Sequence, residues 1–132
     1  MATEADILNG ALARMDGYAT SLPIAWPGIK FTPPQNGQWF EVRYFPNEPN
    51  HFPWDDDGKQ TYIGFLQVSV FGRPNEGIVS LTEEAEGIKA RFAKGTAFGP
   101  VRVSRTPYLL SPIEEDNSIQ IPVTIPYRGV TT

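Results

Sequence analysis

The sequence predicts an α+β fold in which a mostly antiparallel, twisted sheet carries two helices packed on one face. Apolar residues recur at spacings of three and four in two segments, one near the N-terminus and one over residues 78–92, which is typical of amphipathic helices. Apolar and polar residues alternate instead over residues 38–45 and 118–127, which is typical of half-buried strands. With 132 residues and 40% apolar content, the chain is expected to form a single domain over residues 1–132.

Each predicted helix has its own boundary signals. Thr3 caps the first helix, acidic residues occupy its first turn, and Gly17 ends it. The second helix follows a strand over residues 62–72 and a corner over residues 73–77, in which Gly77 eases the entry into the helix. Its apolar stripe is expected to bury against the sheet and comprises Ile78, Leu81, Ala85, Ile88 and Phe92.

The strand predicted over residues 38–45 carries aromatic side chains on both faces. One face comprises Phe40, Val42 and Tyr44, and the other comprises Trp39, Glu41, Arg43 and Phe45. Two interpretations are open at this point. Either one face packs on the helices while the other meets a partner, or both faces are internal.

The strand predicted over residues 118–127 has the most regular alternation in the chain. Pro122 and Pro126 are four residues apart, so both missing amides lie on the same edge of this strand. A central strand would lose ladder hydrogen bonds at these positions. The sequence therefore predicts an edge strand, whose prolines block the addition of a further strand.

Composition argues against several classes of function. A formal net charge of −4 argues against a surface that grips the phosphates of nucleic acid. The absence of cysteine excludes disulfides, thiolate metal sites and thiol nucleophiles. The N-terminus is acidic, unlike the basic start of a signal peptide, and no apolar run is long enough to span a bilayer. We therefore expect a protein that is made in the cytoplasm and has no membrane partner.

A Pro-rich stretch between two strands, at about residues 46–60, predicts a long projecting loop. The segment from Asp55 to Gly58 looks like the start of a calcium loop. Aligning Gly58 with the invariant glycine of that motif, however, places Pro53 at the first ligand position and Gly64 where a glutamate is required. The three aspartates are therefore weak candidates for a divalent cation, and a solvated acidic turn is favoured.

The sequence contains no recognisable catalytic set. His51 is the single histidine, and no Gly-x-Ser-x-Gly turn supplies a serine nucleophile. The corner over residues 73–77 has neither the Gly-x-Gly-x-x-Gly nor the Gly-Lys-Ser/Thr pattern that binds phosphate groups. We therefore expect no catalytic residue, no cofactor and no enzymatic activity, and the features together favour an assembly protein.

The order of the predicted elements resembles a known family. The layout comprises a short N-terminal helix, extended pieces with Trp26-Pro27-Gly28, the strand Trp39-Phe40-Glu41-Val42-Arg43, the strand-corner-helix unit ending Ala93-Lys94-Gly95, and a last strand with Pro122-Val123-Thr124-Ile125-Pro126. Over nearly the whole chain this layout resembles the tail terminator and tail completion proteins of long-tailed bacteriophages, including a small phage-related family of unknown function.

The resemblance implies a structural virion protein at the head-proximal end of the tail, assembled in the host cytoplasm. A homo-hexameric ring would cap the tail tube protein, stop its polymerisation and offer a surface to the head–tail connector protein. DNA would pass through the bore without specific binding, which fits an acidic chain, and a divalent cation at subunit interfaces is compatible with such a ring. The implied contact residues are Phe52, Trp54, Asp55, Asp56 and Asp57, with Arg73 and Glu76 as weaker candidates.

Two alternatives stay open. A head-completion or neck connector protein also forms a ring and shares the lack of chemistry. A small ligand-binding or enzymatic α+β domain would instead need a pocket between helix and sheet, lined by Trp39, Phe65 and Tyr127. The strand faces offer few titratable groups that converge on such a pocket.

Overall fold

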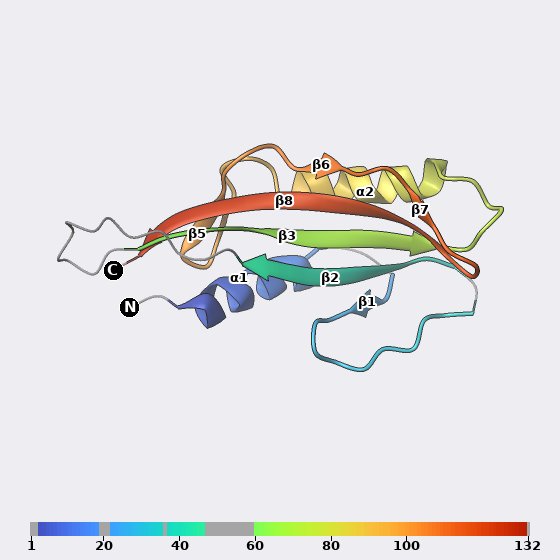
Figure 1. Ribbon diagram of the computed structural model, residues 1–132, viewed down its shortest axis with the longest axis horizontal. Coiled ribbons are helices and arrows are strands. Elements are labelled where there is room, and N and C mark those ends of the chain that lie inside the picture. Colours follow the sequence, from blue (N-terminus) through green and yellow to red (C-terminus); the bar gives the residue numbers. More distant parts are fainter. Residues whose placement is uncertain (1–2, 19–21, 36, 47–59, 132) are drawn as a thin grey trace.

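The structure, a computed structural model, describes residues 3–18, 22–35, 37–46 and 60–131. Figure 1 shows the elements in chain order: α1 (Glu4–Asp16), β1 (Ile24–Ala25), β2 (Trp39–Pro46), β3 (Gln60–Gly72), α2 (Val79–Arg91), β4 (Ala97–Phe98), β5 (Val101–Val103), β6 (Tyr108–Leu109), β7 (Ile113–Glu114) and β8 (Ile119–Thr131). Both predicted helices and the α+β class are confirmed. The predicted loop falls on residues 47–59, which lie outside the described part of the chain.

The strands form one eight-stranded sheet in the order β1-β2-β3-β8-β5-β4, and β6 and β7 also pair with β8. The two-residue strand β1 runs parallel to β2, whereas the other pairs are antiparallel. β3 and β8 pair along their whole lengths, with Gln60 opposite Thr131 and Gly72 opposite Ile119. In Figure 1 these two strands are the long curved arrows at the centre of the molecule.

The prediction that the last strand lies at the edge of the sheet is wrong. β8 pairs with β3 on one side and with β5, β6 and β7 on the other. Pro122 and Pro126 do share one edge, because their carbonyls accept from the amides of Leu110 and Ser104 at 2.9 and 3.0 Å. The missing amides therefore face the second side, where three short strands replace one long strand, and the proline carbonyls still find partners.

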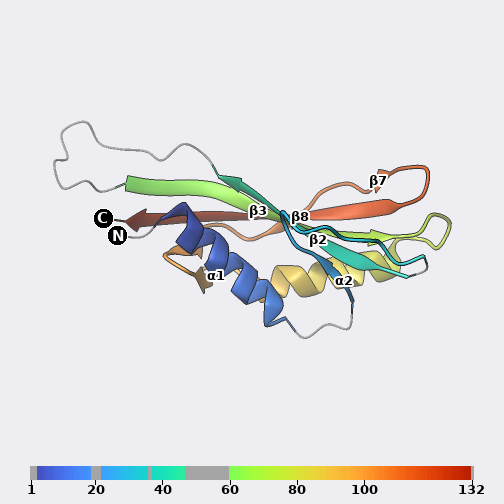
Figure 2. The ribbon, with the colours of Figure 1, turned by 90° about the horizontal axis from the view of Figure 1, so that it is seen from below.

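Both helices pack on the same face of the sheet, which Figure 2 shows as the lower side. The apolar stripe of α1 buries Ile7, Ala11 and Met15, and that of α2 buries Leu81, Ala85 and Ile88. The expectation that Ile78 is buried with this stripe is wrong, because it precedes the first turn of α2 and is 42% exposed. The buried helix residues meet buried sheet residues that all point to this face, namely Phe40, Val42, Leu66, Val68, Val70, Ile121, Val123 and Ile125. Removal of this apolar surface from water is the main stabilising term of the fold.

A reciprocal pair of arginines joins the C-terminal ends of α1 and α2. Arg14 donates from Nε and Nη2 to the carbonyl of Arg91, at 3.1 and 2.9 Å, and Arg91 donates from Nε to the carbonyl of Arg14 at 3.0 Å. Each side chain thus satisfies a carbonyl at the end of the other helix. Burial and the positive charge of Arg91 lower the pKa of Arg14.

A chain of hydroxyl groups ties α1 to the sheet. The Tyr127 hydroxyl donates to the Tyr44 hydroxyl at 3.1 Å, and Tyr44 donates to the Glu4 carboxylate. Burial, followed by the hydrogen bond to Glu4, raises the pKa of Tyr44, and burial raises the pKa of Tyr127. Both phenols therefore stay protonated at neutral pH and keep their donor hydrogens. The network links β8, β2 and the first turn of α1.

Candidate interaction surfaces

The face of the sheet turned away from α1 and α2 is here called the helix-free face. Residues that lie directly opposite one another in the ladders share a face, and the register pairs Trp39 with Phe71, Phe45 with Phe65, and Tyr108 with Thr124. These side chains point away from the helices because their neighbours Phe40, Val42 and Leu66 point toward them. Aromatic residues therefore line both faces of the same strands.

Two stacked aromatic pairs lie on the helix-free face. The Trp39 and Phe71 rings are 5.1 Å apart and nearly parallel, and the guanidinium group of Arg73 lies 5.1 Å from the Trp39 ring centre. The rings of Phe45 and Phe65 are 4.7 Å apart. The first pair is buried, whereas Phe45 is 37% exposed. One end of this face is thus closed by the chain itself, and the other end presents aromatic surface to solvent.

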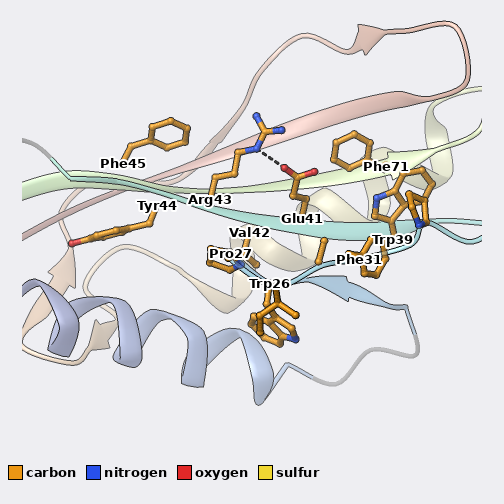
Figure 3. A pocket seen from close by; sticks show the side chains of 14 residues that line it. Trp26, Pro27, Phe31, Trp39, Glu41, Val42, Arg43, Tyr44, Phe45 and Phe71 are labelled. Atoms are coloured by element: carbon orange, nitrogen blue, oxygen red, sulfur yellow. Dashed lines mark hydrogen bonds and ion pairs between the residues drawn. The ribbon is translucent and has the colours of Figure 1, made fainter.

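The outer edge of β2 is largely unpaired. β1 covers only Phe40 and Glu41, and among the described residues no strand continues this pairing from Val42 to Pro46. Beside the edge lies a hollow of about 650 Å³, lined by the turn after β1 and by both faces of β2 (Figure 3). We call this region the β2 edge; its turn residues are Trp26, Pro27, Gly28, Ile29, Lys30 and Phe31, and its strand residues are Val42, Arg43, Tyr44 and Phe45.

The opposite side of the sheet carries a second exposed apolar surface. Figure 1 places β6 and β7 beyond β8, on the side away from β2. Tyr108, Leu110 and Ile113 are between 40% and 46% exposed, and three exposed carboxylates follow them at Glu114, Glu115 and Asp116. We call residues 108–116 the β6–β7 edge. The molecule therefore presents two different apolar surfaces at opposite sides of one sheet.

The comparison with protein families places this geometry in a known context. Residues 6–127 match the family described as phage tail terminator protein. The chain belongs to this family. The resemblance inferred from the sequence is confirmed, and with it a structural role in a bacteriophage tail.

A solved structure whose title states no function has the same fold as this terminator-family chain. The TM-score is 0.79 at 24% sequence identity, and the match covers 100% of this chain and 98% of the other. At this identity the likeness supports the fold alone. Among curated proteins, none matches this chain. Within its described residues, this chain contains no helix that is long and apolar enough to cross a membrane.

The terminator-family chain does not form the pocket that a ligand-binding domain was expected to have. Trp39 lines the hollow at the β2 edge, whereas Phe65 and Tyr127 line a separate hollow of about 370 Å³ near Tyr108. Trp39 and Phe65 point to the helix-free face, so neither can line a pocket between helix and sheet, and Trp39 lies apart from the hollow that Phe65 and Tyr127 share. The expectation of a common pocket between helix and sheet is therefore wrong.

The predicted contact residues fall into two groups. Arg73 is half-buried, donates from Nη1 to the carbonyl of Asn117 at 2.9 Å and from Nη2 to the carbonyl of Pro34, and so joins three segments of the fold. Glu76 lies exposed in the corner that follows. The other candidates, together with the single histidine, lie outside the described residues; they are His51, Phe52, Trp54, Asp55, Asp56 and Asp57. Partner contact by any of these stays a prediction.

Among the residues that the structure describes, no three His, Cys, Asp or Glu side chains gather where they could hold a metal ion. A cation at Asp55, Asp56 and Asp57 stays a prediction as well.

Sequence reasoning missed the exposed apolar residues of the two edges. Ile29 is 66% exposed in the turn after β1, and Tyr108 and Leu110 flank Leu109, which packs partly against the core. An available signal was the alternation from residue 108 to residue 110, which places two apolar side chains on the face opposite Leu109. Apolar residues on both faces of a short strand indicate either a second core or a partner.

Proposed function

We propose that the protein is the tail terminator itself: it caps the finished tail tube, stops further polymerisation and presents the surface on which the head is joined. The observation that carries this proposal is the family match over residues 6–127 of a chain whose sheet leaves apolar surface exposed at two edges. Exposed apolar patches of this kind are typical of surfaces that bind other proteins. The partners in this proposal are the tail tube protein and the head–tail connector protein.

A ring of copies, a hexamer in the resemblance described above, is the assembly that we propose. Two unlike surfaces on one molecule favour head-to-tail contacts, and such contacts close into rings when the rotation between copies allows it. The net charge of −4 also suits a bore through which DNA passes without being held. A divalent cation at the subunit contacts, held by Asp55, Asp56 and Asp57, belongs to the same proposal, and EDTA would then lower the mass of the assembly.

The proposal places the protein at the head-proximal end of the tail in the virion, after assembly in the host cytoplasm. An experiment with purified tail tube protein tests it. Tube polymerisation is followed by electron microscopy with and without added protein, and a gold-labelled copy reports its position. We expect shorter tubes with one labelled end. Tubes of unchanged length without end label would refute the capping role. In a parallel mixture of the labelled protein with purified heads that lack tails, label on the heads would instead favour a neck connector.

A further inference from the structure

We propose that the β6–β7 edge of one copy docks on the β2 edge of the next copy. This inference rests on the ring proposed above and names the surfaces that would join its members.

The two edges match in shape and polarity. The β2 edge is a hollow with apolar walls from Trp26, Pro27 and Phe31, and the nearby Ile29 is 66% exposed. The β6–β7 edge supplies protruding apolar side chains, since Tyr108, Leu110 and Ile113 stand well exposed on an extended segment. Large side chains that enter a preformed apolar hollow are the usual anchors of a protein interface. The β2 edge therefore receives apolar side chains, and the β6–β7 edge supplies them.

The backbone of the β2 edge is ready to accept a strand. The amide of Phe40 donates to the carbonyl of Pro23 at 2.9 Å, so the backbone groups of Phe40 point outward from the sheet at this edge. Because these groups alternate along a strand, those of Val42 and Tyr44 point the same way, beyond the end of the two-residue strand β1. An open edge of this kind binds an extended segment by adding it to the sheet. The segment from Tyr108 to Glu114 already has extended stretches at β6 and β7.

The charges of the two edges are complementary. Lys30 is exposed in the turn that borders the hollow, and the Arg43 side chain is 48% exposed beside it while its Nε donates to Glu41. The β6–β7 edge ends in three exposed carboxylates, Glu114, Glu115 and Asp116. Opposite charges at the rim of an interface speed association and fix its register more than they add affinity. The charges thus favour a second copy of this acidic chain as the occupant.

The position of the two edges sets the symmetry of the assembly. They lie at opposite sides of one sheet, so a copy cannot use both in the same contact with one partner. A two-fold dimer would require the same surface on both molecules, whereas these surfaces differ. The contact is therefore head-to-tail and continues from copy to copy until a ring closes.

The absence of cysteine from the chain permits a direct test by cross-linking. The variant with both Ile29→Cys and Ile113→Cys places one thiol at each edge, and oxidation followed by a non-reducing gel should give a ladder of covalent oligomers. Each single variant should stay monomeric on the gel, because the two positions meet only between copies. The matched control combines Ile29→Cys with Val79→Cys, which replaces another exposed aliphatic residue at the start of α2; it should not give a ladder.

A charge exchange provides a second test that does not depend on thiol geometry. Lys30→Glu should lower the fraction of assembled protein about two- to fivefold, as expected for the loss of a rim ion pair. Adding Glu115→Lys to the same chain should restore the fraction, whereas Glu83→Lys, at an exposed position on α2, should not.

The native mass of the unmodified protein separates the two proposals. A ring-sized particle whose Ile29→Cys and Ile113→Cys variant gives no ladder, and in which Glu115→Lys fails to restore assembly, overturns the docking proposed here and leaves the ring intact. A monomer that stays monomeric in the presence of tube protein overturns both. A ring with the ladder and the charge rescue supports both.

Discussion

The two faces of the sheet are built from the same strands but differ in how far they are buried. Toward the helices, Phe40, Leu66 and Val68 are fully buried under α1 and α2. Away from the helices, the aromatic pair of Phe45 and Phe65 keeps part of its surface in water. The chain therefore completes one face of its own sheet, whereas on the other face it buries the end with Trp39 and Phe71 and leaves the end with Phe45 exposed. The difference shows that the same strands are fully covered on one face and only partly covered on the other.

The edges show the same contrast. Within the described part of the chain, three short strands cover β8 on its second side, and only the two residues of β1 cover β2 on its outer side. A strand that is paired on both sides gains its hydrogen bonds within the molecule, whereas an open edge offers them to another chain. In a free molecule such an edge is a liability, so its exposure beside an apolar hollow fits a protein that works in an assembly.

The largest expected effect on the free energy of unfolding comes from a substitution on the helix-covered face. Leu66→Ala removes a fully buried side chain from the core and should lower the free energy of unfolding by about 2–5 kcal/mol, through lost burial and the cavity left behind. Gln67→Ala, the next residue on β3 but on the opposite face, should change it by less than about 0.5 kcal/mol. Urea unfolding measures both. Similar losses for the two variants would show that the faces do not differ as described.

A smaller effect concerns the closed end of the helix-free face. Arg73→Ala removes two hydrogen bonds to backbone carbonyls and the contact with Trp39, and should cost about 1–3 kcal/mol of unfolding free energy. Arg73→Lys keeps the charge but not the forked geometry, and should recover less than half of the loss. If Arg73→Ala is as stable as the wild type while the mass of the assembly falls, Arg73 serves a partner instead of the fold.

Tyr44→Phe probes the hydroxyl chain on the covered face. Loss of the bond to Glu4 and of the acceptor for Tyr127 should cost about 1–2 kcal/mol. The matched control is Tyr108→Phe, which removes a hydroxyl from an exposed tyrosine of the β6–β7 edge. A loss of similar size in the control, or none in Tyr44→Phe, would contradict the structural role of the network.

The same tyrosines predict a dependence of stability on pH. The pKa values of Tyr18, Tyr44 and Tyr127 are raised in the folded protein, so the native state holds these protons more tightly than the unfolded chain does. Their contribution is fully present below the unfolded pKa of about 10 and is lost as the pH rises above it. Chemical unfolding between pH 9 and about pH 11 should show this decline, with a weaker slope in Tyr44→Phe. A slope that is equal in both proteins would contradict the assignment.

Much of the fold was predictable because its signals are local. The Thr3 cap is formed as expected, with the Asp6 amide donating to its hydroxyl and the Thr3 amide donating to the Asp6 carboxylate. The alternation over residues 38–45 correctly separated the two faces of β2. The edge prediction for β8 failed because the proline pattern reports which amides are missing and not which distant segments lie alongside. Three short strands can pair with β8 although the amides of its prolines are missing on that side, whereas one long strand would lose hydrogen bonds there.

The candidate surfaces were less predictable for a related reason. Exposure of Ile29, Tyr108 and Leu110 depends on which segments pack over them; the alternation over residues 108–110 indicates two faces but not which distant segment covers either one. The sequence did indicate that the face with Trp39 and Phe45 meets either a core or a partner. The structure makes this face internal at Trp39, which is buried, and leaves it open at Phe45, where contact with a partner stays a prediction. The residues chosen from the projecting loop lie outside the described part of the chain, so their role stays a prediction.

The most direct test of the account compares mass and stability in one protein and its variant. Tyr108→Ser combined with Leu110→Ser changes exposed residues of the β6–β7 edge only, so the free energy of unfolding of the monomer should change by less than about 1 kcal/mol. Sedimentation of the wild type at increasing concentration should reveal a ring-sized particle, and the variant should remain monomeric under the same conditions. Assembly of the variant to the same mass as the wild type would contradict the claim that this side of the sheet is reserved for another copy.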